Sequence, residues 1–494
     1  MTHFDLLLIG TGSGNMFLDD RFSGLDVAIA EEWHFGGTCL NVGCIPTKMF
    51  VYPATIAEQA ANAQRYNVTT DFHSVDWPAL QERIFGRVDA IEAGGRDYRS
   101  GDRQPNVSVV AEHVHFTAPK TVQTASGEEI TAARIVIAAG ASPFIPDAKG
   151  LDPQRVDTDG YPVFTSDSIM RVPQRPERLV IIGSGIIAME FAHVFAGFGT
   201  EVTVIARGPR LLGNIDEESS DEFTKIFERT HTVHRGAEVS SYRIDDEQVS
   251  VTLKASGRLG EVDLPSQIET DAVLIATGRT PNTTGLNAAG AGFDVHDDGR
   301  LHVDSQQRVL AHGQPVPGVF ALGDISSPHQ LKHVANHEAD VVGDNLAVDV
   351  AAGEPGAATE EHLRTVNHHA VPGAVFTSPQ VAYVGITEDE ARRAGHDVSV
   401  KVQKYSDVAY GWAMADDPGI VKIIADQTTR QILGAQIVGH EASMIVQPLI
   451  QAMAFGLPAD EMANRQYWIH PALPEVVENA LLGLDFDAEG PQNP

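Results

Sequence analysis

Residues 4–15 read Phe-Asp-Leu-Leu-Leu-Ile-Gly-Thr-Gly-Ser-Gly-Asn, and this stretch indicates the fold of the N-terminal part of the chain. The apolar run ends at Gly10 and predicts a buried parallel strand, and the glycines after it predict a tight turn into a helix. A second apolar run, at residues 27–30, is followed by Glu31. This order of strand, glycine-rich turn, helix and strand is typical of a domain that binds a dinucleotide.

The same order of features returns later in the chain. Residues 179–182 are an apolar run that leads into Gly183, Gly185 and Ala188, and a helical pattern continues to a strand expected at 201–205. One glycine motif alone could be an ordinary turn, but two in matching surroundings are harder to dismiss. The sequence therefore predicts an α/β protein with two Rossmann-like dinucleotide-binding domains and, from alternating strand patterns near 419–424 and 433–438, a C-terminal α+β domain.

Composition and charge exclude several classes of function. The chain has 494 residues, with 67 acidic and 35 basic side chains, and its formal charge of −32 disfavours a nucleic-acid-binding protein. No apolar run approaches the roughly 20 residues that span a bilayer, and the N-terminus has no signal-like segment. Two cysteines cannot form the framework of a disulfide-rich secreted scaffold. We therefore expect a cytoplasmic protein without membrane or nucleic-acid partners.

The two glycine motifs differ in the nucleotide that they favour. In the first, Gly10, Gly12 and Gly14 let a pyrophosphate approach the backbone, and Glu31 is placed to accept a ribose hydroxyl; Asn15 stands where a third glycine is usual. In the second, which contains Gly183, Gly185 and Ala188, no acid follows the second strand. Arg207 and Arg210 stand there instead, which favours the 2′-phosphate of NADPH, unless they are solvent-facing loop residues.

The chain's only cysteines lie in the block Gly36-Gly-Thr-Cys-Leu-Asn-Val-Gly-Cys-Ile-Pro-Thr-Lys48. The spacing of Cys39 and Cys44 does not fit a zinc site, and neither they nor the histidines, His368 and His369 included, suggest a metal. Pro46 predicts a helix start that would place Cys44 at a helix N-terminus, where a thiolate is favoured. A redox-active disulfide is the interpretation that best accounts for this block.

These motifs resemble those of the FAD-dependent pyridine nucleotide–disulfide oxidoreductases over nearly the whole chain. The resemblance implies that Cys44 faces the flavin, that Cys39 attacks the substrate disulfide, and that Lys48 and Glu190 form an ion pair near the flavin. It also implies that Asp324 binds the ribitol and that a helix starting near His333 points at the flavin. The other cofactor-binding positions that it implies are Gly37, Thr38, Ala139, Gly140 and Gly278.

Near the C-terminus, His470 precedes Glu475 by five residues. Such a pair is often structural, but a histidine held by a carboxylate can act as acid and base for thiol chemistry near neutral pH. The resemblance implies that this pair reaches into the site of a second subunit, so a homodimer with shared active sites is expected.

The domain limits expected are residues 1–150 and 300–364 for binding FAD, 151–299 for NADPH, and 365–484 for dimerisation, with a disordered tail at 485–494. Several blocks, among them residues 47–52, 331–338, 407–414 and 466–470, are similar to the branch of the family that reduces mycothione, the disulfide of mycothiol. The sequence thus predicts an NADPH-dependent flavoenzyme that converts mycothione to two mycothiols. Tyr410, Trp412 and Tyr467 are candidates for contacting this substrate or for packing.

Alternative functions remain open at this point. A glutathione reductase is disfavoured. Its relatives in the family carry an arginine for a carboxylate of the substrate, but the comparable residues 19–21 here read Asp-Asp-Arg, and an acid there would repel that carboxylate. An NAD-linked dihydrolipoamide dehydrogenase is the main alternative, and His333 is compatible with it. A catalytically silent binding module or redox sensor is a third.

Overall fold

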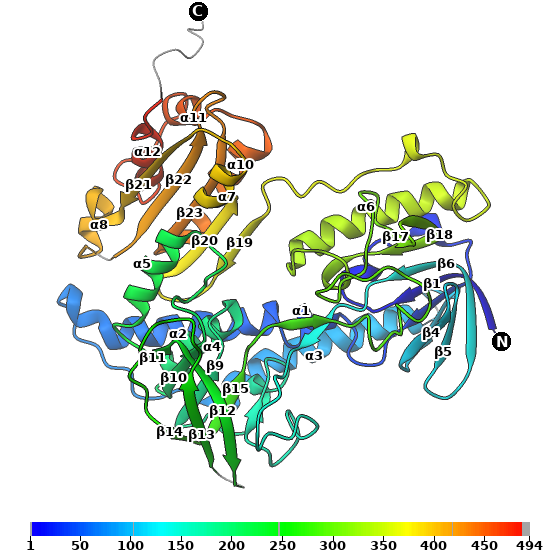
Figure 1. Cartoon of the computed structure of the whole chain (residues 1–494), viewed down its shortest axis with the longest axis horizontal. Helices are drawn as coiled ribbons and strands as arrows, with labels where there is room; N and C mark the ends of the chain where they lie inside the picture. Colours follow the sequence, from blue (N-terminus) through cyan, green and yellow to red (C-terminus); the bar gives the residue numbers. More distant parts are fainter. Residues whose placement is uncertain (1, 102, 246–247, 417, 487–494) are drawn as a thin grey trace, which may run out of the picture. The chain divides into compact units, whose positions relative to one another are not determined.

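The computed structural model describes residues 2–101, 103–245, 248–416 and 418–486. The chain divides into two compact units. The first unit consists of Met1–Thr47, Pro78–Phe144 and Gly278–His368, and the second of Lys48–Trp77, Ile145–Thr277 and His369–Pro494. Figure 1 labels the elements that form each unit. The expected tail at 485–494 lies almost entirely outside the described residues.

The first unit is built on a mixed sheet with the order β17-β18-β6-β1-β2-β3. Strand β1 (Thr2–Ile9) pairs in parallel with β2 (Val27–Ala30) and with β6 (Glu129–Ile137), and β6 pairs in parallel with β18 (Gln314–Ala321). β3 (Val107–Val110) and β17 (Arg308–Ala311) form the edges, and β4 (Val114–Ala118) and β5 (Thr121–Thr124) continue from β6.

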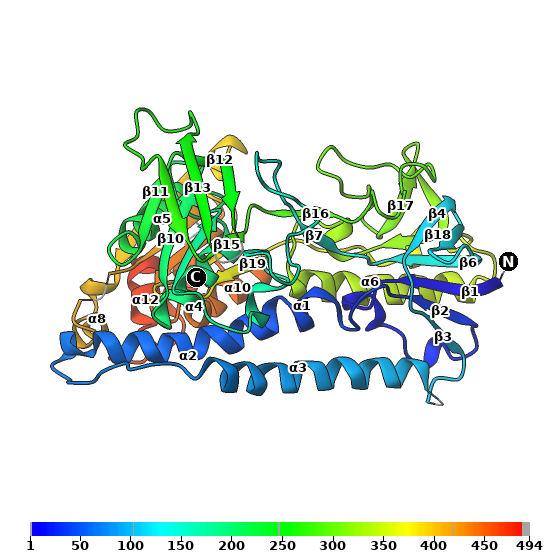
Figure 2. The ribbon, with the colours of Figure 1, turned by 90° about the horizontal axis from the view of Figure 1, so that it is seen from below.

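Both faces of this sheet are buried, which explains the uninterrupted apolar run in β1. Leu6 and Leu8 face one core, to which helix α6 (Lys332–Ala351) contributes, and Leu7 and Ile9 face another. Figure 2 shows α6 lying along the sheet. The carboxyl ends of β1 and β6 therefore meet beside the first glycine turn.

The α-helix expected after the first glycine turn does not form. Only two short 3₁₀ segments, Ser13–Asn15 and Asp20–Phe22, connect β1 to β2. The Asp19 carboxylate accepts the backbone N–H of Arg21, and such local bonds compete with a continuous helix. Sequence periodicity did not reveal this competition.

The second unit contains the predicted second βαβ motif. Strand β9 (Arg178–Ile182) leads through the glycine turn into α4 (Ile186–Gly197) and then β10 (Glu201–Ala206). The parallel sheet has the order β11-β10-β9-β15-β8, with β11 (Thr232–Arg235), β15 (Ala272–Ile275) and β8 (Val163–Phe164). A small antiparallel sheet joins β12 (Ala237–Ile244), β13 (Val249–Ala255) and β14 (Gln267–Thr270), and helix α5 (Glu217–Phe227) follows β10.

The C-terminal part of the second unit is the expected α+β fold. An antiparallel sheet runs in the order β19-β20-β23-β22-β21, with β19 (Pro372–Val375), β20 (Gln380–Gly385), β21 (Val398–Lys404), β22 (Ile420–Asp426) and β23 (Ile432–Gly439). The helices around it are α7 (Glu388–Arg393), α8 (Ala409–Ala413), α9 (Ala442–Ile445), α10 (Gln447–Ala454), α11 (Ala459–Asn464) and α12 (Glu475–Leu482). Strands β22 and β23 are buried nearly throughout rather than on alternate residues.

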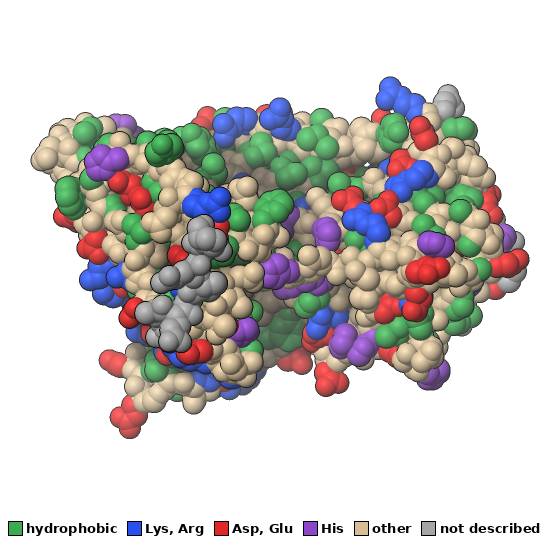
Figure 3. All heavy atoms as spheres, turned by 90° about the horizontal axis from the view of Figure 1, so that it is seen from above, with side chains coloured by type: hydrophobic (Ala, Val, Ile, Leu, Met, Phe, Trp, Pro, Cys, Tyr) green, Lys and Arg blue, Asp and Glu red, His purple; other side chains and the backbone are tan. Residues whose placement is uncertain are grey.

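The long helices α2 (Cys44–Asn62) and α3 (Trp77–Ser100) complete the chain, with the short α1 (Gly37–Asn41) before them. Within the described ranges, no helix has the length and apolar character needed to cross a membrane. On the face drawn in Figure 3, acidic side chains are spread over the surface, and several basic ones lie against them.

Candidate active site

The first glycine turn joins the end of β1 to the start of the 3₁₀ segment Ser13–Asn15. Gly10 has φ = 98°, and a Cβ there would lie 2.4 Å from the Ala138 carbonyl oxygen, so a side chain is excluded. Above Gly12, an added Cβ would meet nothing within 4 Å. This open backbone is suited to a pyrophosphate, although the absent α-helix means that N–H groups of the turn, and not a helix dipole, would bind it.

Glu31 and Asn15 hold this turn in place. The Glu31 Oε2 atom accepts hydrogen bonds from the Thr11 backbone N–H (3.0 Å) and hydroxyl (2.6 Å). The side chain of Asn15, which replaces the usual third glycine, donates from Nδ2 to the Thr11 carbonyl at 2.5 Å, and its Oδ1 accepts from Arg99 at 3.1 Å. The substitution at position 15 thus adds bonds that a glycine could not make.

The two cysteines are not joined by a disulfide bond, and their thiols lie in hydrogen-bonding contact. Cys44 is the first residue of α2, as Pro46 predicted. The neighbouring Cys44 sulfur and burial raise the pKa of Cys39, while the ammonium of Lys332 acts to lower it. Cys39 therefore holds its proton more tightly than an ordinary thiol and needs a base to react as a nucleophile.

Lys332, which sequence analysis did not single out, is the first residue of α6. Its Nζ donates to the Ser13 hydroxyl at 2.7 Å, and that hydroxyl donates to the Asn336 side chain at 2.9 Å. The ammonium is close enough to Cys39 and Cys44 for their charges to raise its pKa, against a larger lowering by burial. Lys332 and Ser13 are 319 residues apart in the sequence, so only the tertiary structure reveals this contact.

Asp324 follows β18, where the resemblance implied a residue that binds ribitol. Burial raises the pKa of this carboxyl group above its ordinary value. In the part of the chain that is described, no side chain of another residue donates a hydrogen bond to it, so its oxygens suit a hydroxyl-rich ligand. Beside it, Glu338 accepts the Gly323 N–H at 2.7 Å and fixes the backbone at this point.

The remaining flavin positions surround the same turn in the first unit. Gly37 has φ = 65°, and a Cβ there would lie 2.9 Å from the Gly12 Cα. Thr38 begins α1 with it, Ala139 and Gly140 follow β6, and His333 is exposed near the start of α6. Together with the open turn and the half-buried Asp324, these residues fit FAD.

Lys48 and Glu190 form the expected ion pair inside the second unit. Lys48 Nζ lies 2.8 and 2.7 Å from the two Glu190 carboxylate oxygens, and Glu190 is only 3% exposed. Sequence analysis missed Phe376, which follows β19: its N–H donates to Glu190 at 3.0 Å, and its ring centroid lies 4.8 Å from Lys48 Nζ. Phe376 thus orients both members of the pair.

The second glycine turn repeats the geometry of the first. A Cβ on Gly183 would lie 2.2 Å from the Ala276 carbonyl oxygen, Gly185 is open, and the small Ala188 is fully buried in α4. Arg207 is exposed at the end of β10. Arg210 instead pairs with Glu217 and Asp221 of α5, so Arg207 is the better placed of the two for a phosphate. Gly278 belongs to the first unit.

His470 and Glu475 also pair as expected. His470 Nδ1 lies 2.6 Å from Glu475 Oε1, and Glu475 is the first residue of α12. The His470 side chain is 72% exposed, so its other ring nitrogen is available to groups outside this chain. Tyr410, Trp412 and Tyr467 are exposed, which excludes core packing for them.

The described residues include no group of three or more histidine, cysteine or carboxylate side chains that could hold a metal ion.

The fold and these motifs define a family. Residues 4–339 match the model of the pyridine nucleotide-disulphide oxidoreductases, and residues 371–481 match the dimerisation domain of the same family. The chain belongs to this family and is an FAD-dependent disulfide oxidoreductase, which confirms the expected fold class and the cofactors FAD and NADPH.

Individual relatives differ in their similarity. Mycothione reductase of Mycobacterium tuberculosis is 47% identical over 98% of this chain and 100% of its own length. Dihydrolipoyl dehydrogenase of Halobacterium salinarum is 31% identical over 97% of this chain and 96% of its own. Among solved structures, the HOCl-induced flavoprotein disulfide reductase RclA of Escherichia coli matches with a TM-score of 0.78, 25% identity, and coverage of 97% and 100%.

Proposed function

We propose that this chain is a homodimeric, cytoplasmic enzyme that uses NADPH to reduce mycothione to two mycothiols. The observation that carries the proposal is the contact between the thiols of Cys39 and Cys44, in a chain with end-to-end similarity to a mycothione reductase. FAD, held by the first glycine turn and Asp324, would supply the two-electron chemistry by which NADPH reduces the Cys39–Cys44 disulfide.

The reduction of the substrate then follows from the thiols. Cys39, deprotonated by the partner subunit's His470, attacks one sulfur of mycothione and forms a mixed disulfide. The first mycothiol leaves as a thiolate and takes a proton from that histidine. Cys44 next loses its thiol proton and attacks the Cys39 sulfur, the S–S bond to the second mycothiol breaks, and the departing thiolate takes up that proton, which restores the Cys39–Cys44 disulfide. The 2.6 Å contact with Glu475 holds the imidazole in position.

The other site residues have supporting roles in this proposal. The first glycine turn, Glu31 and Asp324 would hold FAD, and the Lys48–Glu190 pair would assist the delivery of hydride from NADPH. The second glycine turn and Arg207 hold NADPH.

Two observations separate this substrate from its alternatives. The guanidinium of Arg21, in the stretch that would have to recognise a glutathione carboxylate, is paired with Asp19 and Asp344, so it is not available to a substrate carboxylate. The exposed Arg207 favours NADPH over the NAD of a dihydrolipoamide dehydrogenase. Mycothiol carries hydroxyls rather than carboxylates, and the exposed rings of Tyr410, Trp412 and Tyr467 can stack on its sugar.

The test is steady-state oxidation of NADPH and NADH by the purified holoenzyme with mycothione, glutathione disulfide and lipoamide in parallel. We expect turnover with NADPH and mycothione. Turnover with lipoamide and NADH alone would instead identify a dihydrolipoamide dehydrogenase.

A Cys39→Ser variant tests the role of the attacking thiol. It should retain bound flavin and lose disulfide reduction by a factor of about 10³ or more, because a hydroxyl is a far weaker nucleophile at neutral pH. The measurement is mycothione-dependent NADPH oxidation beside the flavin spectrum. Wild-type turnover in this variant would contradict the mechanism.

A further inference from the structure

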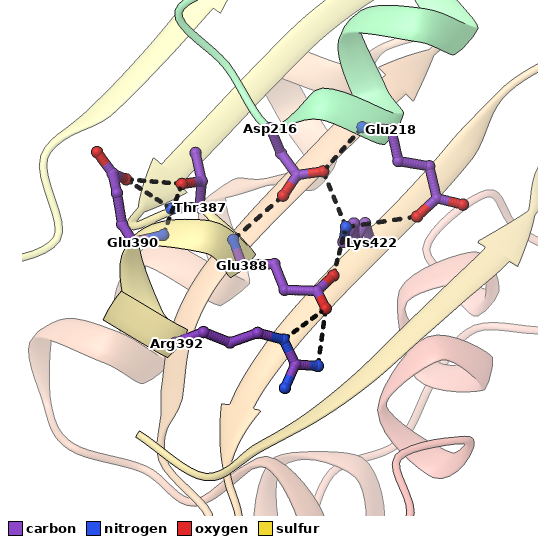
Figure 4. A network of polar contacts seen from close by, with 7 residues as sticks. All are labelled: Asp216, Glu218, Thr387, Glu388, Glu390, Arg392 and Lys422. Carbon is purple, nitrogen blue, oxygen red and sulfur yellow. Dashed lines mark hydrogen bonds and ion pairs between the residues drawn. The ribbon is translucent and has the colours of Figure 1, made fainter. Parts of the chain in front are cut away.

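A buried lysine lies in the middle of the C-terminal sheet of the second unit. Lys422 on β22 has a side chain only 5% exposed, and its Nζ lies 2.8 Å from Glu388, 2.9 Å from Asp216 and 3.4 Å from Glu218 (Figure 4). Burial acts to lower its pKa, but the bonds to Glu388 and Asp216 outweigh this and raise it. Lys422 is therefore a permanent cation that needs these carboxylates.

Asp216 connects the cluster to α5, the helix that follows β10 of the second βαβ motif. It is 3% exposed, and its Oδ1 accepts the Glu218 N–H at 3.2 Å, so it caps the N-terminus of α5. Its Oδ2 accepts the Glu388 N–H at 3.2 Å, at the first residue of α7. One carboxylate thus joins α5, α7 and the ammonium on β22, as Figure 4 shows.

Asp216 is also the last residue of the loop that carries Arg207. This loop, residues 207–216, is attached to the second glycine turn, because the Leu212 N–H donates to the Ser184 carbonyl at 2.8 Å. It is attached to α5 as well, since the Leu211 N–H donates to the Thr224 hydroxyl at 3.0 Å and its carbonyl accepts from Ser220 at 2.7 Å. The position of the loop is consequently set by where α5 begins.

The side chain of Arg207 has no such support. Among the described residues it makes no ion pair or side-chain hydrogen bond, and only its carbonyl is held, by the Ser256 hydroxyl at 2.8 Å. Where its guanidinium lies therefore depends on the backbone of the loop.

We propose that Asp216 and Lys422 are positioning residues for coenzyme selection, which hold the loop 207–216 so that Arg207 meets the 2′-phosphate of NADPH. This inference rests on the proposed role of Arg207. NADH has no 2′-phosphate, so its binding depends on the glycine turn and not on the position of Arg207. A cluster that only stabilised the fold would affect both coenzymes alike.

The experiment measures binding of 2′,5′-ADP and 5′-AMP to the holoenzyme by calorimetry. In Lys422→Met and in Asp216→Asn, we expect 2′,5′-ADP to bind about tenfold more weakly, the loss of one charge-assisted contact, while 5′-AMP changes less than about twofold. The KM for NADPH should rise with kcat at saturation unchanged. Lys422→Arg should restore most of the affinity, because it keeps the buried cation.

Lys401→Met is the matched control. Lys401 lies on the neighbouring strand β21, opposite Ile423 of β22, and is not part of the cluster. The same substitution there should leave both affinities unchanged.

A double-mutant cycle with Arg207→Ala tests the coupling directly. In that background, Lys422→Met should no longer weaken the binding of 2′,5′-ADP. The proposal is overturned if both nucleotides lose affinity in parallel, if neither does, or if the effect of Lys422→Met persists without Arg207. If Lys422→Met does not fold, Asp216→Asn carries the same comparison. Failure to reduce mycothione would refute the proposed substrate and leave this test intact.

Discussion

At the scale of single residues, the site depends on charges that the sequence shows only in part. The cysteine spacing, the Lys48–Glu190 pair and the His470–Glu475 pair could be predicted, since each rests on a motif or a resemblance. Lys332, Phe376 and Glu338 could not, because each acts through a residue distant in the sequence. Only the folded chain brings their charges and N–H groups to the site.

The charge of Lys332 leads to a prediction about the reactivity of the two cysteines. A cation near a thiol stabilises its thiolate, so Lys332→Met should move the pH midpoint of cysteine alkylation upward by about 1 unit. At pH 7 the reduced variant would therefore react more slowly with iodoacetamide. The measurement is the alkylation rate of the reduced protein across pH.

Two variants control this experiment. Lys332→Arg keeps the charge and should keep the midpoint. Lys120→Met removes a lysine that donates to the Ala133 carbonyl elsewhere in the first unit, and it should have no effect. An unchanged midpoint in Lys332→Met would show that the ammonium does not act on the thiols.

At the scale of elements, the parallel strands and the second βαβ motif were predictable from their apolar runs and glycines. The helix after the first turn was not, because Asp19 bonds to local backbone in place of a helix. The continuous burial of β22 and β23 also differs from the expected alternation, since helices and strands cover both faces. Hydrophobic periodicity predicts that one face of a strand is buried, but it does not show whether the fold covers the other face as well.

Helix α6 is joined to the sheet by a buried ion pair, which supports a second prediction. Arg134 of β6 donates to Asp349 at 2.6 Å and to the Gly353 carbonyl at 2.8 Å, and both charged side chains are at most 6% exposed. Asp349→Ala leaves the guanidinium unpaired and should lower the free energy of unfolding by about 3–5 kcal/mol. Urea unfolding followed by circular dichroism and by flavin release measures it.

Asp344→Ala is the control on the same helix. Asp344 is 39% exposed and pairs with Arg21 and Arg364, so its loss should cost less than about 1 kcal/mol. Equal effects of the two substitutions would refute the importance of the buried pair.

At the scale of the whole molecule, the acid excess is a property of the surface. The described buried carboxylates, Glu190, Asp216, Glu338 and Asp349, each have a hydrogen-bond or ion-pair partner inside the chain. The charge of −32 must therefore be carried mainly by exposed groups that repel one another. The sequence gives the size of this charge, while its location required the structure.

Screening should stabilise such a molecule. Between 0.1 and 1 M salt the Debye length falls from about 10 to about 3 Å, so we expect Tm to rise by a few degrees, given that about 1 kcal/mol shifts the Tm of a large domain by roughly 2–4 °C. Differential scanning calorimetry in KCl, NaCl and tetramethylammonium chloride would measure it. Similar rises in all three salts indicate screening, and a flat or falling Tm would contradict it.

The exposed position of His470 has a genetic consequence. If each working site takes its thiols from one subunit and its imidazole from the other, a Cys39→Ser chain and a His470→Gln chain are each inactive as homodimers. Mixed in one cell, they would form heterodimers in which both lesions fall on one site and the other site is intact. Two null alleles would then complement each other, whereas two alleles altered at the same residue would not.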